Sequence, residues 1–302
     1  MTVKVSTEEK AKLKGQGFLP QRDGEHFICR VITMDGNLNS EGARKLSFIA
    51  DHYGRGYMSC TSRLTVEIPW IKYEDIEKVK KELSEVGLYS GGTGSRVRPI
   101  VACKGTVCVL GLLDTQKFAR IIHERFYEGY YDIILPHKFK IGIGGCPNSC
   151  IKPDLNDFGI SGQRMPAFNE DLCSGCKKCG VVEACKVNAA KIADGKLQID
   201  AEKCNNCGLC IGKCHFHAVE CKEEGVKLFI GGKWGKVPKR GQALAGIFTR
   251  DEALNILEKA ILYYKEKGST GERFGDMIDR IGFEEVVKVI LGKNNGQTYL
   301  KV

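Results

Sequence analysis

Apolar residues recur at helical spacing in several stretches of this 302-residue chain. Residues 39–52 illustrate the pattern, because Leu46, Ile49 and Ala50 fall on one face of a helix that Asn39 or Ser40 can cap. The same spacing predicts helices over 73–86 and 283–291, one that Asp114 caps, and one capped by Asp251 that runs to about Lys267.

Other stretches are β-rich and alternate between apolar and polar positions, at least in part. These strands are expected at residues 25–34, 57–70, 98–103, 138–143 and 226–230. The resulting order β-α-β-α-β within residues 1–100 predicts a compact α+β unit. A second unit is predicted over 101–165 and 222–302, interrupted at 166–221 by a Cys-rich stretch that we interpret as an inserted module.

Twelve of the fifteen cysteines fall into three ordered sets. The first set joins two separated pairs, and the other two are runs of four: Cys103, Cys108, Cys146 and Cys150; Cys173, Cys176, Cys179 and Cys185; Cys204, Cys207, Cys210 and Cys214. Four soft thiolates that converge on one point suit an iron–sulfur cube. The sequence therefore predicts three 4Fe–4S clusters and electron transfer.

The last two runs have the spacing of a two-cluster bacterial ferredoxin, in which the fourth cysteine of each run ligates the other cluster. That rule places Cys214 with the first run and Cys185 with the second. Two departures stand out: five residues precede Cys185 instead of three, and neither fourth cysteine is followed by proline. The longer gap is either a loop insertion or a change of cluster type, and a paired zinc ribbon is the alternative interpretation of the whole module.

Composition and charge indicate the cellular compartment and the kinds of partner. The N-terminus has charges but no apolar signal core, and no uncharged stretch approaches the roughly 18 residues of a membrane span, so we expect a cytoplasmic protein with reduced thiols. The net charge of +9 is spread along the chain without a nucleic-acid-binding motif. It indicates either an ordinary solvated surface or attraction of anionic ligands and acidic donor proteins.

The segment Gly144–Gly162 (GGCPNSCIKPDLNDFGISG) and the pair in CKGTVC resemble the signature of the sulfite and nitrite reductases that couple siroheme to a 4Fe–4S cluster. This family usually has five residues between the first two cysteines, whereas four separate Cys103 from Cys108. The resemblance implies an N-terminal ferredoxin-like half domain and an α/β siroheme and 4Fe–4S domain around the inserted ferredoxin module. It also implies that Cys150 bridges the cluster to the siroheme iron.

The family also surrounds its substrate with two arginines and two lysines. The matching positions here are Arg30, Arg98, Lys138 and Lys140. Thr61 and Arg63 resemble the family's siroheme-carboxylate segment, and the loop 231–241 offers a second clamp. That clamp would use the backbone and side chains of Gly232, Lys233 and Lys236. Taken singly, each cation is more often a solvated strand residue, and a glycine-rich loop is more often only a turn.

These observations predict a siroheme-dependent reductase that converts sulfite to sulfide with six electrons, most similar to the catalytic subunits of anaerobic sulfite reductases. Nitrite reduction to ammonia on the same cofactor is one alternative, and a non-catalytic iron–sulfur carrier is another. An electron-donor protein or accessory flavin and iron–sulfur subunits are the expected partners. We further expect a homodimer or higher oligomer, in which one copy supplies the four cations and another supplies Cys150.

Overall fold

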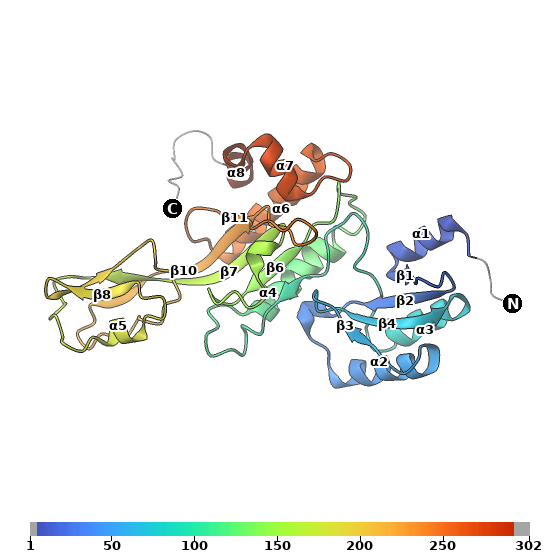
Figure 1. Ribbon diagram of the computed structural model, residues 1–302, viewed down its shortest axis with the longest axis horizontal. Coiled ribbons are helices and arrows are strands. Elements are labelled where there is room, and N and C mark those ends of the chain that lie inside the picture. The colour runs from blue at the N-terminus through green and yellow to red at the C-terminus, as the bar shows by residue number, and fades with distance from the viewer. Residues whose placement is uncertain (1–4, 293–302) are drawn as a thin grey trace.

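The computed structural model describes residues 5–292, which form three parts along one long axis (Figure 1). The N-terminal unit lies at one end, a sheet flanked by helices lies at the centre, and the Cys-rich insert lies at the far end. This arrangement matches the predicted α+β architecture. Among the described helices, none combines the length and the apolar character that crossing a bilayer requires.

The N-terminal unit is an antiparallel sheet in the order β1-β2-β4-β3. Its elements are α1 (Thr7–Gly15), β1 (Phe18–Pro20), β2 (His26–Val31), η1 (Met34–Gly36), α2 (Ser40–Tyr53), β3 (Ser59–Cys60), β4 (Val66–Lys72), η2 (Tyr73–Asp75) and α3 (Ile76–Ser84). Side chains along β2 alternate between buried and partly exposed positions, so Cys29 enters the core while Arg30 faces away from it. The predicted strand 57–70 is in fact two strands joined by a turn at residues 61–65.

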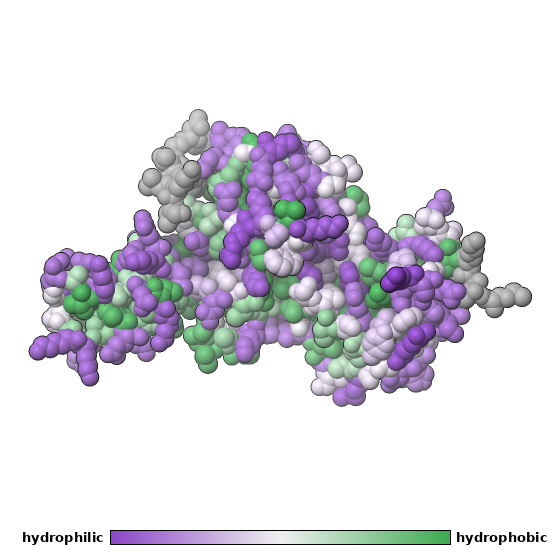
Figure 2. Space-filling model, viewed as in Figure 1, coloured by the Kyte–Doolittle hydropathy of each residue, from purple (hydrophilic) through white to green (hydrophobic). Residues whose placement is uncertain are grey.

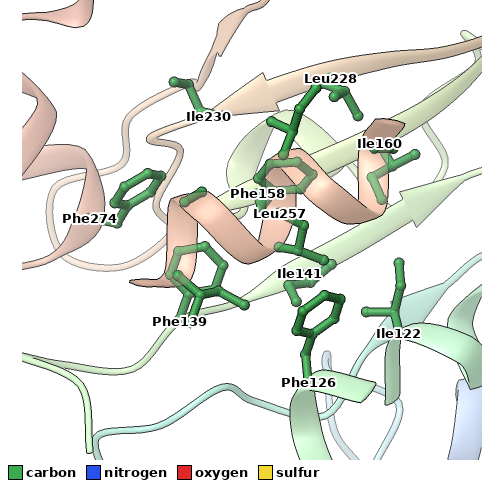
Figure 3. Close-up of a cluster of buried hydrophobic side chains, with 14 of the residues drawn as sticks. Ile122, Phe126, Phe139, Ile141, Phe158, Ile160, Leu228, Ile230, Leu257 and Phe274 are labelled. Atoms are coloured by element: carbon green, nitrogen blue, oxygen red, sulfur yellow. The ribbon is translucent and has the colours of Figure 1, made fainter. Parts of the chain in front are cut away.

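The central sheet has the order β11-β10-β7-β6-β5. Its strands are β5 (Val101–Ala102), β6 (Ile141–Gly144), β7 (Phe158–Phe168), β10 (Val219–Ile230) and β11 (Gln242–Ala243), and the helices around it are α4 (Thr115–Ile122), η3 (His123–Glu128), η4 (Pro153–Leu155), α6 (Arg250–Lys267), α7 (Phe274–Ile281) and α8 (Phe283–Leu291). Strands β5, β6 and β7 run parallel, so the loops after them meet at one edge. Figure 3 shows the core of this part, in which Phe126, Phe139 and Phe158 gather around Leu257 of α6.

The insert is carried on a long ribbon formed by β7 and β10, which pair antiparallel from Phe158↔Ile230 out to Phe168↔Val219. It contains α5 (Gly180–Ala184), β8 (Ala190–Ala193) and β9 (Lys196–Ile199), and it has a small core of its own. Both ends of the predicted insert, 166 and 221, fall inside these strands. The insert therefore grows out of a hairpin that continues the central sheet.

Helix ends follow local hydrogen bonding. Asn39 and Asp114 cap α2 and α4 as predicted, each accepting a backbone N–H three residues later. The predicted cap of α6 was wrong: Thr249 caps that helix, and Glu252 completes a capping box by returning a hydrogen bond to Thr249. Asp251, which lies between them, is already inside the first turn.

A buried ion pair fastens α7 to the central sheet. Asp157, immediately before β7, is fully buried and accepts a hydrogen bond from Arg273 Nη2 at 2.7 Å and one from the Lys140 backbone N–H at 2.8 Å. Removing one partner from a buried pair leaves an uncompensated charge, which is far more costly than losing an exposed pair.

We therefore expect Arg273→Met to lower the free energy of unfolding by about 3 kcal/mol. The matched control is Arg240→Gln, because Arg240 makes an ion pair of the same length with Asp154 but is exposed; this change should cost under about 0.5 kcal/mol. Chemical denaturation of both variants measures the difference. Equal losses would show that the buried pair is not structurally important.

Candidate functional site

A cavity of about 210 Å³ lies between the N-terminal unit and the central sheet. It is lined by Arg30, Thr61, Ser62, Arg63, Thr65, Gly92, Arg98, Pro99, Lys138 and Lys140. The structure thus brings together all four predicted substrate cations with Thr61 and Arg63. Within the part of the chain that the structure describes, no acidic side chain lines this cavity, so its walls are strongly electropositive.

Backbone pairing sets the positions of the cations. Arg98 and Phe139 lie on adjacent extended segments, joined by a hydrogen bond of 2.8 Å from the Arg98 N–H to the Phe139 carbonyl. Phe139 is buried in the core, and side chains alternate along extended backbone. Lys138 and Lys140 therefore both project away from the core and into the cavity.

Arg63 joins the two units directly. Its guanidinium donates to Asn156 Oδ1 at 2.6 Å, to the Pro99 carbonyl at 2.7 Å and to the Ile141 carbonyl at 3.3 Å. Its Nε atom is buried and has no hydrogen-bond partner in the described residues. Burial lowers the pKa of Arg63 to about 10, which still leaves the side chain protonated at neutral pH.

The other two arginines share one backbone acceptor. Arg30 and Arg98 both donate through Nη1 to the Gly92 carbonyl, and Arg30 also forms an ion pair with Glu67 at 2.6 Å. The Nε atom of Arg98 is buried without a partner among the described residues. Burial, and secondarily the charge on Arg30, lowers the pKa of Arg98 to about 10.

The two lysines are the cations whose charge is least stable. Burial lowers the pKa of Lys140 to about 8, with further lowering by Arg63, Arg273 and Lys138. The pKa of Lys138 also falls, through burial and through the charges of Arg273 and Arg98. A lysine with such a pKa can both attract an anion and give up a proton near neutral pH.

The glycine-rich loop does not reach this cavity. Gly232 packs against the carbonyl oxygens of Asp154 and Asn156, with no room for a side chain, and Lys233 forms an ion pair with Asp276. Lys236 is exposed to solvent. Gly232 therefore packs behind Asn156, and none of the three residues lines the cavity, so the carboxylate clamp stays a prediction.

The first cysteine set lies at the edge where parallel strands β5 and β6 end. The Gly145 N–H donates to Cys103 Sγ at 3.1 Å, and a Cβ atom on Gly105 would lie only 3.0 Å from the Gly145 Cα atom, so the two ligand loops pack closely. Burial and the negative charge of the other three thiolates raise the pKa of Cys146. Cys150 is exposed and does not line the cation cavity.

In the insert, one small cavity is lined by Cys185, Cys204, Cys207 and Cys210, the grouping that the ferredoxin rule predicts. Burial raises the pKa of Cys210 to about 11, and the other three thiolates add to the rise. For the second group, Gly180, next to Cys179, packs against the carbonyl of Lys213, which precedes Cys214. This contact brings the two ends of that ligand set together.

The donor chemistry at the cysteines fits iron–sulfur clusters. Backbone N–H groups point at three of the predicted ligand sulfurs: Cys103 Sγ at 3.1 Å, Cys185 Sγ at 3.2 Å and Cys173 Sγ at 3.5 Å. Such hydrogen bonds to sulfur tune cluster potentials. In residues 5–292, no three His, Cys, Asp or Glu side chains close around a single metal ion.

The cation cavity fits part of a siroheme site. Its unpartnered guanidinium Nε atoms and its two lysines suit carboxylates and a small oxyanion, whereas about 210 Å³ is too small for a whole tetrapyrrole. A larger cavity of about 670 Å³ lies between the insert and α8, beside Cys204, and contains none of these cations.

The sequence interpretation missed residues that act behind the cavity wall. Asn156 and Asp157 lie inside the segment Gly144–Gly162, but their contacts with Arg63 and Arg273 link positions far apart in the chain. Gly92 gave a signal in the pattern Gly91-Gly92-Thr93-Gly94, which is typical of backbone in close contact.

Comparison with known proteins identifies the family to which this chain belongs. Residues 93–298 match the profile "Nitrite and sulphite reductase 4Fe-4S domain", and residues 19–86 match "Nitrite/Sulfite reductase ferredoxin-like half domain". The chain is 29% identical over 299 residues to a subunit of the anaerobic sulfite reductase of Salmonella typhimurium, covering 91% of this chain and 86% of that protein.

It is also 35% identical over 283 residues to the coenzyme F420-dependent sulfite reductase of Methanocaldococcus jannaschii, covering 92% of this chain but only 44% of that protein. A crystal structure of dissimilatory sulfite reductase I has the same fold, with a TM-score of 0.72 at 20% identity over 93% of this chain and 72% of the other. The chain therefore belongs to the nitrite and sulfite reductase family of oxidoreductases.

Proposed function

We propose that this protein is the catalytic subunit of a siroheme-dependent sulfite reductase, which converts sulfite to sulfide with six electrons and six protons and releases three waters. The observation that carries the proposal is the cavity in which Arg30, Arg98, Lys138 and Lys140 converge without an acidic partner among its lining residues. When bound, siroheme would supply the iron at which the anion is reduced, and the 4Fe–4S clusters would supply its electrons.

The chain's own residues account for anion binding and proton supply. Four cations fixed by the protein before the substrate arrives stabilise a doubly charged oxyanion without reorganisation. Lys140, whose pKa is about 8, is protonated at neutral pH and can release a proton as oxygen leaves as water. Arg63, with Thr61 beside it, would hold siroheme carboxylates through its unpartnered Nε atom.

The chemistry of the cavity suits nitrite as well, and relatives of both kinds exist: the nitrite reductase [NAD(P)H] of Bacillus subtilis is 22% identical over 272 residues. We favour sulfite because the relatives with the higher identities given above are sulfite reductases. A non-catalytic electron carrier has no use for four buried or half-buried cations around a cavity, which argues against that alternative.

We propose that the complete site forms between two copies of the chain. Cys150 does not line the cation cavity, and the cavity is too small for a whole tetrapyrrole. The loop between β5 and α4 carries Cys108 between Val107 and Val109, which are 75% and 99% exposed. Figure 2 shows a hydrophobic protrusion at this place, and apolar surface of this kind marks interfaces.

Replacing Cys150 tests the proposed site directly. We expect Cys150→Ser to abolish sulfite reduction and the red absorption bands of siroheme, because the thiolate would hold the macrocycle iron. The insert clusters should remain. Anaerobic absorption spectra and dye-coupled turnover measure both effects. Cys221→Ser is the control, since Cys221 is also exposed and lies outside the three cysteine sets; a Cys150 variant as active as this control would refute the assignment.

Anion binding should depend on pH through Lys140. Because Lys140 is protonated below its pKa of about 8 and neutral above it, anion affinity should be highest below that value and fall as pH rises through it. Nitrite is the probe, since it does not titrate in this range. The KM for nitrite should rise about ten-fold across this transition, the size expected for losing one charge-assisted contact. In Lys140→Arg the transition near pH 8 should vanish; its persistence would assign it to another group.

Two inactive variants can test whether the site is shared between two copies. Lys138→Met/Lys140→Met and Cys150→Ser should each be inactive alone. In a dimer containing one copy of each, one of the two sites would take its cations from the Cys150→Ser copy and its thiolate from the other. Random pairing in co-expression should therefore restore about a quarter of wild-type activity. A site built within one chain predicts no recovery.

A further inference from the structure

The segment from Tyr89 to Gly92 reaches the cation cavity at Gly92. It pairs with the end of β2, because the Ile32 N–H donates to the Tyr89 carbonyl at 2.9 Å and the Gly91 N–H donates to the Arg30 carbonyl at 3.0 Å. This segment, which we call the arginine strap (residues 89–92), ends at the carbonyl that Arg30 and Arg98 share.

The arginine strap packs closely against neighbouring side chains at both of its glycines. Gly92 has a φ of +73°, and a Cβ atom there would lie 2.9 Å from Pro99 and 3.0 Å from Ile32. A Cβ atom on Gly91 would lie 2.7 Å from the Tyr127 hydroxyl oxygen. A side chain at either position would displace these neighbours, and the positive φ of Gly92 also favours glycine. Because glycine leaves the backbone free to rotate, contacts with neighbouring elements must hold it in place.

The contacts that hold it come from η3, a single π-helical turn of the central part. The Gly92 N–H donates to Tyr127 Oη at 3.0 Å in a buried hydrogen bond. At the other end of the strap, the Tyr89 hydroxyl lies 2.6 Å from His123 Nε2 and donates to Glu128 at 3.1 Å. The rings of His123 and Tyr127 pack together with centroids 4.7 Å apart, and π-turns are frequent at functional sites.

We propose that Tyr127 is a positioning residue for the anion site: its hydroxyl fixes the Gly92 backbone, whose carbonyl oxygen orients Arg98 and Arg30. The hydrogen bond from the Gly92 N–H to Tyr127 anchors the Cα atom from which the Gly92 carbonyl extends, and so sets where that carbonyl starts. This inference rests on the proposed anion-reducing function. Tyr127 does not line the cavity, and its hydrogen bond to Gly92 joins it to the strap.

The test is Tyr127→Phe in the cofactor-loaded protein. This change keeps the ring but leaves the buried Gly92 N–H without an acceptor. We expect the Kd for nitrite, titrated by visible absorption, and the KM for sulfite each to rise about ten-fold, with kcat changing less than about two-fold. The matched control is Tyr130→Phe, because the Tyr130 hydroxyl donates to Glu258 of α6, away from the cavity.

A double-mutant cycle separates positioning from general destabilisation. In an Arg98→Met background, Tyr127→Phe should raise the nitrite Kd clearly less than it does in the wild-type background, since one of the two arginines through which it acts is gone. A Tyr127→Phe protein with wild-type Kd and KM, or with an equal effect in both backgrounds, would overturn the inference and leave the proposed function intact. A wild-type protein that binds neither anion would overturn both.

Discussion

Crowded positive charge is the constraint on which this structure depends. Arginines 30, 63 and 98 and lysines 138 and 140 line one cavity of about 210 Å³ that no acidic side chain in the described residues enters. Burial and mutual repulsion lower the pKa of Arg63, Arg98 and Lys140. Such an arrangement is unfavourable unless anions occupy it, and we infer that substrate and cofactor carboxylates are those anions.

The surrounding fold holds this charge in place. Backbone carbonyls of Pro99, Ile141 and Gly92 accept hydrogen bonds from the arginines, so their orientation depends on how the two units meet. Behind the wall, Asp157 and Arg273 tie Lys140's backbone to α7 through a buried ion pair. Other elements position the predicted cluster ligands. The first cysteine set lies at the edge where parallel strands end, and the hairpin of β7 and β10 carries the other two cysteine sets away from the cavity.

Sequence patterns predicted the parts of this fold that local chemistry determines. Helices α2, α3 and α8 follow from apolar spacing and caps, and the family signature gave the cations that line the cavity. Features that depend on long-range packing were not predictable. Helix α7 was missed because it has only eight residues and begins without a side-chain cap, although its apolar residues have helical spacing. Strands β7 and β10 were missed as long strands because their outer halves are half-exposed or exposed. Gly232, Lys233 and Lys236 were chosen by loop composition; they do not line the cation cavity, and their role as a carboxylate clamp stays a prediction.

The most direct test is an anaerobic crystal structure of the cofactor-loaded protein with sulfite or nitrite bound. We expect the anion within hydrogen-bonding distance of Arg98, Lys138 and Lys140 of one copy, in a site that Cys150 of a second copy completes. An anion bound elsewhere, for example in the larger cavity beside Cys204, with the five cations still free of any ligand, would contradict the account.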